Sequence, residues 1–368
     1  MISLFRPNYW IFVLLAYFAL HGTFQFFLSG TTEFDRPTGS FLYDKIHEVA
    51  AQLPLSKAQL LALQNNIILF LTFAFIFQTI RRFGRADWAW VTTLCLFFIP
   101  QVVWVSQHSD GVVDLATLAS VAVVCAFAWL LDHRNLVAYG MFGAAIGMAC
   151  LTSMTAMFVV ATLLAAAATH KAGWKLCWNW RMWVAVVVAL MWSAPQWGQV
   201  AEFVAIASDQ ASALSFDALL AEADGLHIVA QATLSFAGFL AVGIGLLFHH
   251  GLGGLPRVDQ GYLDLRQILA RQLAIAFVMF LILRPFIDLS DLTYATLRPV
   301  LILLVPLAGL YLAPLLTPYM REMIARGAVI VAAIILLASP AQYSNAPGGI
   351  TAWYLELRAS EDARTPLL

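Results

Sequence analysis

Two acidic side chains just after the first apolar segment are the strongest candidates for chemistry in this sequence. Glu33 and Asp35 lie in the polar stretch that follows an apolar run over 9–29, and that run is long enough to cross a bilayer. A carboxylate held close to the hydrocarbon boundary loses part of its hydration, which makes it a candidate general base or cation ligand. We therefore predict catalytic roles for Asp35 and Glu33, with a helix N-cap or a solvating loop charge as the alternative.

A second group of polar residues stands at the end of the third apolar run. Trp104, Gln107, His108 and Asp110 lie close together where the chain leaves the predicted helix. Histidine titrates near neutral pH, so it can orient an acceptor group or bind a metal. We predict that these four residues contact a substrate. The alternative is a capping cluster at the membrane interface.

A third candidate is Arg298, which opens a late apolar run after a polar connection that contains Asp288 and Asp291. Pro299 fits the first turn of a helix, where its missing N–H costs nothing. The pattern predicts a guanidinium at the outer membrane boundary, where it would suit a lipid phosphate or pyrophosphate. The alternative is an ion pair with Asp288 or Asp291.

Polar residues inside the apolar runs are a separate class. Asp114 lies within the fourth run, where a buried acid is a functional-site candidate, and His21 lies within the first. The amides of 64–66 open the second run and are expected to bond across helices. No nucleotide-binding fingerprint occurs, and the four cysteines include no close pair that indicates a zinc site or a disulfide.

The elements that must position these residues are membrane helices. A hydrophobic fraction of 61%, a charged fraction of 11% and a mean hydropathy of +0.81 exclude an ordinary soluble fold. Apolar runs of about 20 residues predict an all-α, polytopic transmembrane bundle rather than a barrel. A net charge of −1 argues against a nucleic-acid partner.

About eleven spans are predicted in one transmembrane domain over 1–368. Their ranges are 9–29, 62–80, 88–107, 111–131, 137–151, 153–169, 182–200, 228–248, 272–287, 297–314 and 327–339. The intervening loops place most Lys and Arg residues on the side of the N-terminus, which predicts a cytoplasmic N-terminus. The remaining segments are then first and second periplasmic loops at 30–60 and 201–227, a cytoplasmic loop at 249–271 and a periplasmic tail at 340–368.

Several short motifs occur in a recognisable order. They are Glu33-Phe34-Asp35, Leu53-Pro54-Leu55, Gln64-Asn65-Asn66, Arg81-Arg82-Phe83-Gly84, Ile99-Pro100-Gln101-Val102-Val103-Trp104, Ala149-Cys150-Leu151-Thr152-Ser153 and Arg298-Pro299-Val300-Leu301. This order resembles the GT-C integral-membrane glycosyltransferases that use polyprenyl-phosphate sugars, such as the lipid A aminoarabinose transferase, the lipopolysaccharide galacturonosyltransferases and the protein O-mannosyltransferases. The resemblance covers about the first 200 residues and returns over 294–314, with differences at several motif positions.

The resemblance implies sugar transfer at the periplasmic face of a bacterial inner membrane. The family's catalytic aspartate falls on Asp35, and basic residues of the family hold the departing lipid phosphate. The implied partners are a polyprenyl-phosphate-linked sugar, a lipid, glycan or protein acceptor, and membrane lipids. No cofactor is implied, and a divalent cation stays open. The alternatives are a lipid or solute transporter that uses Asp114 and His21, and a catalytically silent membrane scaffold.

Overall fold

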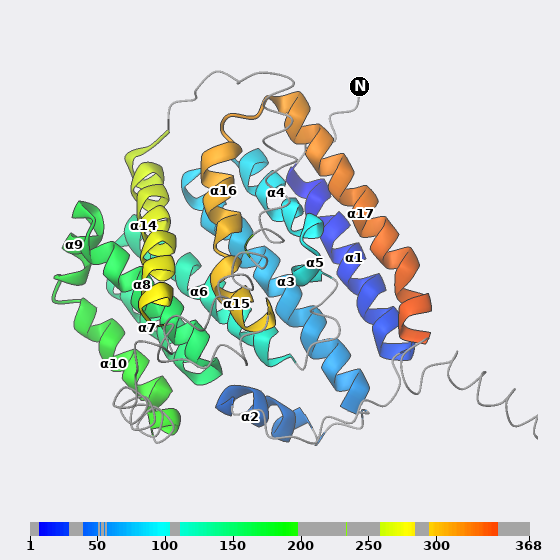
Figure 1. Ribbon diagram of the computed structural model, residues 1–368, viewed down its shortest axis with the longest axis horizontal. Helices are drawn as coiled ribbons and strands as arrows, with labels where there is room; N and C mark the ends of the chain where they lie inside the picture. The colour runs from blue at the N-terminus through cyan, green and yellow to red at the C-terminus, as the bar shows by residue number, and fades with distance from the viewer. Residues whose placement is uncertain are drawn as a thin grey trace, which may run out of the picture.

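The structure is a computed structural model that describes residues 7–28, 40–50, 52, 55, 57–103, 111–197, 233, 258–283 and 294–344. All regular elements within these ranges are helices, as Figure 1 shows, which confirms the all-α prediction. Their bounds are α1 Pro7–Leu28, α2 Phe41–Ala50, α3 Lys57–Phe83, α4 Ala86–Leu94, η1 Cys95–Phe98, α5 Pro100–Val103, α6 Val112–His133, α7 Leu136–Thr152, α8 Met154–Ala168, α9 Lys171–Cys177, α10 Met182–Ser193, η3 Ala194–Gln196, α14 Gln260–Leu283, α15 Tyr294–Leu301, α16 Leu304–Leu312 and α17 Pro318–Ser344.

The membrane character rests on long apolar helices. Among the described residues, four segments are long and apolar enough to cross a bilayer: Trp10–Phe27, Gln59–Phe83, Val112–His133 and Pro318–Ser339. The bent pair α8 and α9 makes a fifth if it counts as one span. The chain is therefore a membrane protein with four or five candidate spans in its described part, and the larger number of spans stays a prediction. The predicted span 228–248 lies outside the described residues except for Thr233.

Several boundaries follow directly from local chemistry. The predicted break between 137–151 and 153–169 is found at Ser153, whose hydroxyl accepts a hydrogen bond from the Ala156 N–H at 3.1 Å and caps α8. The described part of the predicted span 88–107 is divided into α4, η1 and α5. The break between η1 and α5 falls at Ile99, which is extended because it precedes Pro100 and proline disfavours helical backbone in the residue before it.

Three predicted loop segments contain helix. α14 begins at Gln260, so the predicted cytoplasmic loop over 249–271 is helical from that residue onward. Asp264, Arg266 and Arg271 lower the hydropathy of its first turns, which hid them from a search for apolar runs. α17 likewise extends into the predicted tail, and α2 lies within the predicted first loop.

The tightest helix pair is α7 with α10. A Cβ atom on Gly143 would lie 2.3 Å from the Ala185 carbonyl oxygen, and one on Gly147 would lie 2.5 Å from the Trp192 Cβ. Small residues four apart let the two backbones approach closely, as in other membrane helix pairs. This contact fixes α10 against the side of the main apolar core.

The two ends of the bundle differ in chemistry. Figure 1 shows α2 across the lower edge, whereas α14 and α17 begin at the upper edge. Basic groups tie helices together at the upper end, where Arg82 Nη1 donates to Asp132 at 3.1 Å and Arg181 Nη1 donates to the Arg134 carbonyl at 2.7 Å. We call this the basic end, and we call the opposite end, where Tyr43 of α2 packs with Ile68 and Leu115, the α2 end.

Candidate functional site

A buried layer of polar side chains lies at the α2 end. Its members come from α1, α3, α6 and α15, and each is at most 8% exposed. They are His21, Gln25, Gln64, Asn65, Asn66, Asp114 and Arg298. Burying polar groups in an apolar bundle costs free energy unless they are paired or serve a ligand. We call this set the polar layer.

The strongest contact in the polar layer is an ion pair between α15 and α6. Arg298 is the largest fully buried side chain in the described part of the chain, and its Nη1 donates to Asp114 Oδ1. Asp114 lies in the first turn of α6, where the helix dipole favours a negative charge. The pair therefore joins two helices and holds the guanidinium in one orientation.

The rest of the Arg298 guanidinium is unpaired within the described part of the chain. Its Nε and Nη2 atoms are buried and have no hydrogen-bond partner among the described residues. These two N–H groups form one edge of the planar guanidinium, the fork that binds a carboxylate or phosphate with two parallel hydrogen bonds. Arg298 lines a cavity of about 10 Å³ with Asp114, Ile68, Leu69, Thr72, Val102 and Thr117. That volume holds about one water molecule, so a phosphate would have to displace the lining side chains.

A hydrogen-bond chain connects α1 to α3 on the other side of the layer. The His21 Nδ1 and Asn66 Oδ1 atoms lie 2.8 Å apart, and because a carbonyl oxygen only accepts, Nδ1 carries the proton in this contact. Asn66 Nδ2 in turn donates to Gln25 Oε1 at 2.6 Å and to the Ala62 carbonyl at 2.8 Å. The prediction that the amides bond across helices is confirmed for Asn66.

Gly111 closes the layer beneath α2. Its φ of +81° is in the left-handed region that favours glycine. A Cβ atom there would lie 2.8 Å from the Tyr43 ring and 3.1 Å from Asn65 Oδ1. The Gln64 side chain also lies beside Gly111, with its Nε2 atom 3.5 Å from the same Cβ position. Both of its amide atoms are buried without a partner in the described part of the chain. Gln64 is thus a second candidate contact for a polar ligand.

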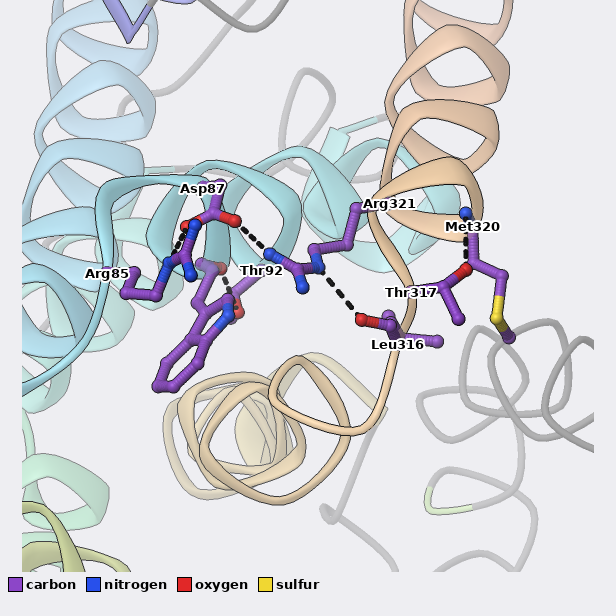
Figure 2. Close-up of polar contacts among 8 residues, drawn as sticks. Arg85, Asp87, Thr92, Leu316, Thr317, Met320 and Arg321 are labelled. Atoms are coloured by element: carbon purple, nitrogen blue, oxygen red, sulfur yellow. Dashed lines mark hydrogen bonds and ion pairs between the residues drawn. The ribbon is translucent and has the colours of Figure 1, made fainter. Parts of the chain in front are cut away.

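A second ion pair, at the basic end, gives a comparison for Arg298. Figure 2 shows that Arg321 of α17 donates through Nη1 to Asp87 of α4 and through Nε to the Leu316 carbonyl, the latter at 3.0 Å. Asp87 also accepts from Arg85 Nε at 3.1 Å. The Arg321 Nε therefore has a backbone partner, whereas the Arg298 Nε has none among the described residues. The Arg321 cluster is a structural clamp between α4 and α17.

Most of the predicted site residues fall outside the described part of the chain. These are Glu33, Asp35, Trp104, Gln107, His108 and Asp110, and also the proposed ion-pair partners Asp288 and Asp291. Their roles stay predictions. The flanking residues that are described, Ser40 before α2 and Gly111 before α6, are at the α2 end.

The expected position of Arg298 within its helix is corrected. The sequence predicted a guanidinium in the first turn, but α15 begins at Tyr294, and the Arg298 side chain is 1% exposed. Pro299 accordingly lies inside α15 rather than at its start. Within the described residues the ion-pair partner of Arg298 is Asp114, which is 184 residues away in sequence, so no local pattern could identify it. A pair with Asp288 or Asp291, which lie outside these residues, stays a prediction.

The described residues contain no group of three or more His, Cys, Asp or Glu side chains that could hold a metal ion. Gln64 and Gly111 were not predicted as site residues. Their positions in the sequence could have indicated them, because Gln64 opens a predicted span and Gly111 precedes one.

In comparisons with known proteins, no family model, curated protein or solved structure matches this chain.

Proposed function

We propose that the protein is an integral-membrane glycosyltransferase of about eleven spans. It would move a sugar from a polyprenyl-phosphate donor to a lipid, glycan or protein acceptor at the periplasmic face of a bacterial inner membrane, with its N-terminus in the cytoplasm. The observation that carries the proposal is the Arg298 fork, which has no partner among the described residues and is buried and oriented by Asp114 at the end of the bundle where the chain leaves α1. The stretch that follows α1 carries Glu33 and Asp35.

The chemistry requires a base and a cation on opposite sides of the reacting carbon. Asp35 would accept the proton of the acceptor group while the acceptor atom bonds to the anomeric carbon of the sugar. The bond from that carbon to the phosphate oxygen breaks at the same time, and the phosphate leaves with the electron pair. Arg298 would stabilise the growing negative charge on the phosphate through its Nε and Nη2 donors.

Access to the Arg298 fork requires movement, because its cavity takes about one water molecule. Ile68 and Leu69 of α3 and Val102 of α5 line that cavity. α5 is a four-residue helix that follows the break at Ile99, so it is the lining element with the fewest helical hydrogen bonds to lose. We expect donor binding to displace α5 rather than α3.

The test is donor turnover by the purified full-length protein in lipid nanodiscs. A panel of polyprenyl-phosphate pentoses and hexoses is supplied with a bacterial lipid extract as acceptor, and released polyprenyl phosphate is measured. We expect the Asp35→Asn variant to be inactive and to keep normal expression and thermal stability. Glu48→Gln is the control, because Glu48 is exposed on α2 and pairs only with the neighbouring Lys45 among the described residues. Normal turnover in Asp35→Asn would remove the catalytic assignment.

A second candidate function is transport of a lipid or solute. Its support is that Asp114 and His21 are both buried within the helix bundle and both have polar partners there. A transporter would move substrate across a vesicle membrane without consuming it, and this movement would depend on Asp114 but not on Asp35. Vesicle uptake measured with Asp35→Asn and Asp114→Asn separates the two functions. A protein that shows neither activity would be the silent scaffold.

A further inference from the structure

A cluster of exposed tryptophans marks one corner of the basic end. Trp174 lies on α9, Trp178 and Trp180 lie in the turn that follows it, and Trp183 lies in the first turn of α10. They are between 49% and 72% exposed. Figure 1 shows this corner at the far side of the bundle from α17. An indole ring is apolar over most of its surface but carries one N–H donor, so it favours the level of the lipid headgroups.

The same corner carries positive charge that is not neutralised locally. Lys171 and Lys175 are exposed and make no ion pair with any residue in the described ranges. Arg181 lies beside them, with its guanidinium carbon 5.8 Å from the centre of the Trp180 ring. The stretch 169–183 contains no Asp or Glu. The corner therefore offers cations and aromatic rings without a competing carboxylate of its own.

The fold fixes which face of α9 points outward. α9 bends by 112° from α8, and its inner face is held by Gly173 and Leu176. A Cβ atom on Gly173 would lie 2.4 Å from the Ala167 carbonyl oxygen, so α9 packs backbone to backbone on the end of α8. The Tyr139 hydroxyl donates to the Leu176 carbonyl at 3.2 Å and ties α9 to α7 as well.

The outward face alternates cations and aromatic rings. Lys171, Trp174, Lys175 and Trp178 are spaced i, i+3, i+4 and i+7, which puts all four on one side of the helix. The Trp174 and Trp178 rings lie 5.1 Å apart, so they form a continuous apolar ledge. We call these four residues the α9 face.

We propose that the α9 face binds the headgroups of anionic phospholipids in the leaflet at the basic end. The two ammonium groups would contact the phosphates, and the two indole rings would lie at the boundary between headgroups and acyl chains. A zwitterionic lipid carries no net charge and would gain less from the lysines. This inference concerns lipid selectivity and holds whether or not the protein transfers sugars.

The test uses the full-length protein reconstituted in vesicles of equal parts phosphatidylcholine and phosphatidylglycerol. Bromine atoms are placed on the acyl chains of one lipid or of the other, and quenching of tryptophan fluorescence is compared. We expect stronger quenching by brominated phosphatidylglycerol. This preference should fall several-fold in Lys171→Gln/Lys175→Gln. The largest expected loss is about fivefold for each lysine removed. Trp174→Phe/Trp178→Phe should remove most of the difference, since these rings would report it.

Two controls make the result specific. Lys45→Gln removes one exposed charge at the α2 end and should leave the preference unchanged. Lys171→Arg/Lys175→Arg keeps the charges and should retain the preference if charge rather than folding is responsible. Equal quenching by the two lipids in the unmodified protein would overturn the proposal, and so would a preference that survives Lys171→Gln/Lys175→Gln.

Discussion

At the scale of single residues, two buried arginines divide into different roles. Arg298 and Arg321 each donate from Nη1 to an aspartate on another helix. Arg321 also has a backbone acceptor for Nε, whereas two N–H groups of Arg298 have no partner among the described residues. An unsatisfied buried donor costs about 1–3 kcal/mol, so the open fork is expensive for a residue whose role is only structural. Arg321 is therefore the matched control for Arg298.

The first residue-scale prediction compares lysine at the two positions. Lysine keeps the charge but loses the planar fork. We expect Arg298→Lys to weaken donor use by about 1.5–3 kcal/mol, the value of a hydrogen bond to a charged group, and Arg321→Lys to leave it unchanged. The rate of polyprenyl phosphate release, measured as a function of donor concentration, gives the first effect. Thermal unfolding in detergent gives the stability. If Arg298→Lys lowers only the unfolding temperature, Arg298 is a structural partner of Asp114.

The second residue-scale prediction concerns coupling between Arg298 and Asp114. Removing one partner breaks the buried ion pair and leaves the other charge without it, so Asp114→Asn and Arg298→Gln should each lower the unfolding free energy by about 3–5 kcal/mol. The double variant leaves no buried charge and should lose much less than the sum. A double-mutant cycle in mixed detergent micelles measures the coupling. Additive losses within about 0.5 kcal/mol would show that the ion pair does not form.

At the scale of elements, the α7–α10 contact should depend on Gly143 and not on Gly140. Gly143 faces the α10 backbone, whereas a Cβ atom on Gly140 of the same helix would have no atom within 4 Å. We expect Gly143→Ala to destabilise the protein by about 1–3 kcal/mol through overpacking. Gly140→Ala should be neutral or stabilising, since alanine favours the helix by about 1 kcal/mol. Thermal unfolding of both variants is the measurement, and equal effects would mean that the two helices can separate at no cost.

At the scale of the whole molecule, the orientation in the membrane is the property to test. Most Lys and Arg residues lie on the side of the N-terminus in the predicted topology, and α9 and α2 lie at opposite ends of the bundle. On a background without the four native cysteines, we expect Lys45→Cys to react with an impermeant maleimide in intact cells. Lys175→Cys should react only after lysis. The reverse pattern of labelling would invert the topology and put Asp35 in the cytoplasm.

The sequence by itself determined the helices and most of their positions. Apolar runs need helical backbone in a bilayer because no water satisfies their N–H and C=O groups, so 111–131 and 137–151 were found close to α6 and α7. The same reasoning failed where the pattern was mixed. The charged first turns of α14 concealed its start, and the effect of Pro100 on Ile99 divided a predicted span into shorter helices.

Only the tertiary structure decided which polar residues meet. The partner of Arg298 is Asp114, on a helix far away in sequence, and which two guanidinium N–H groups stay open depends on how α15 packs on α6. Gln64 enters the site only because α3 turns it towards Gly111 and Tyr43. Local sequence specifies helices because backbone hydrogen bonds are local, whereas a buried site depends on packing between helices, which is not encoded in any single stretch.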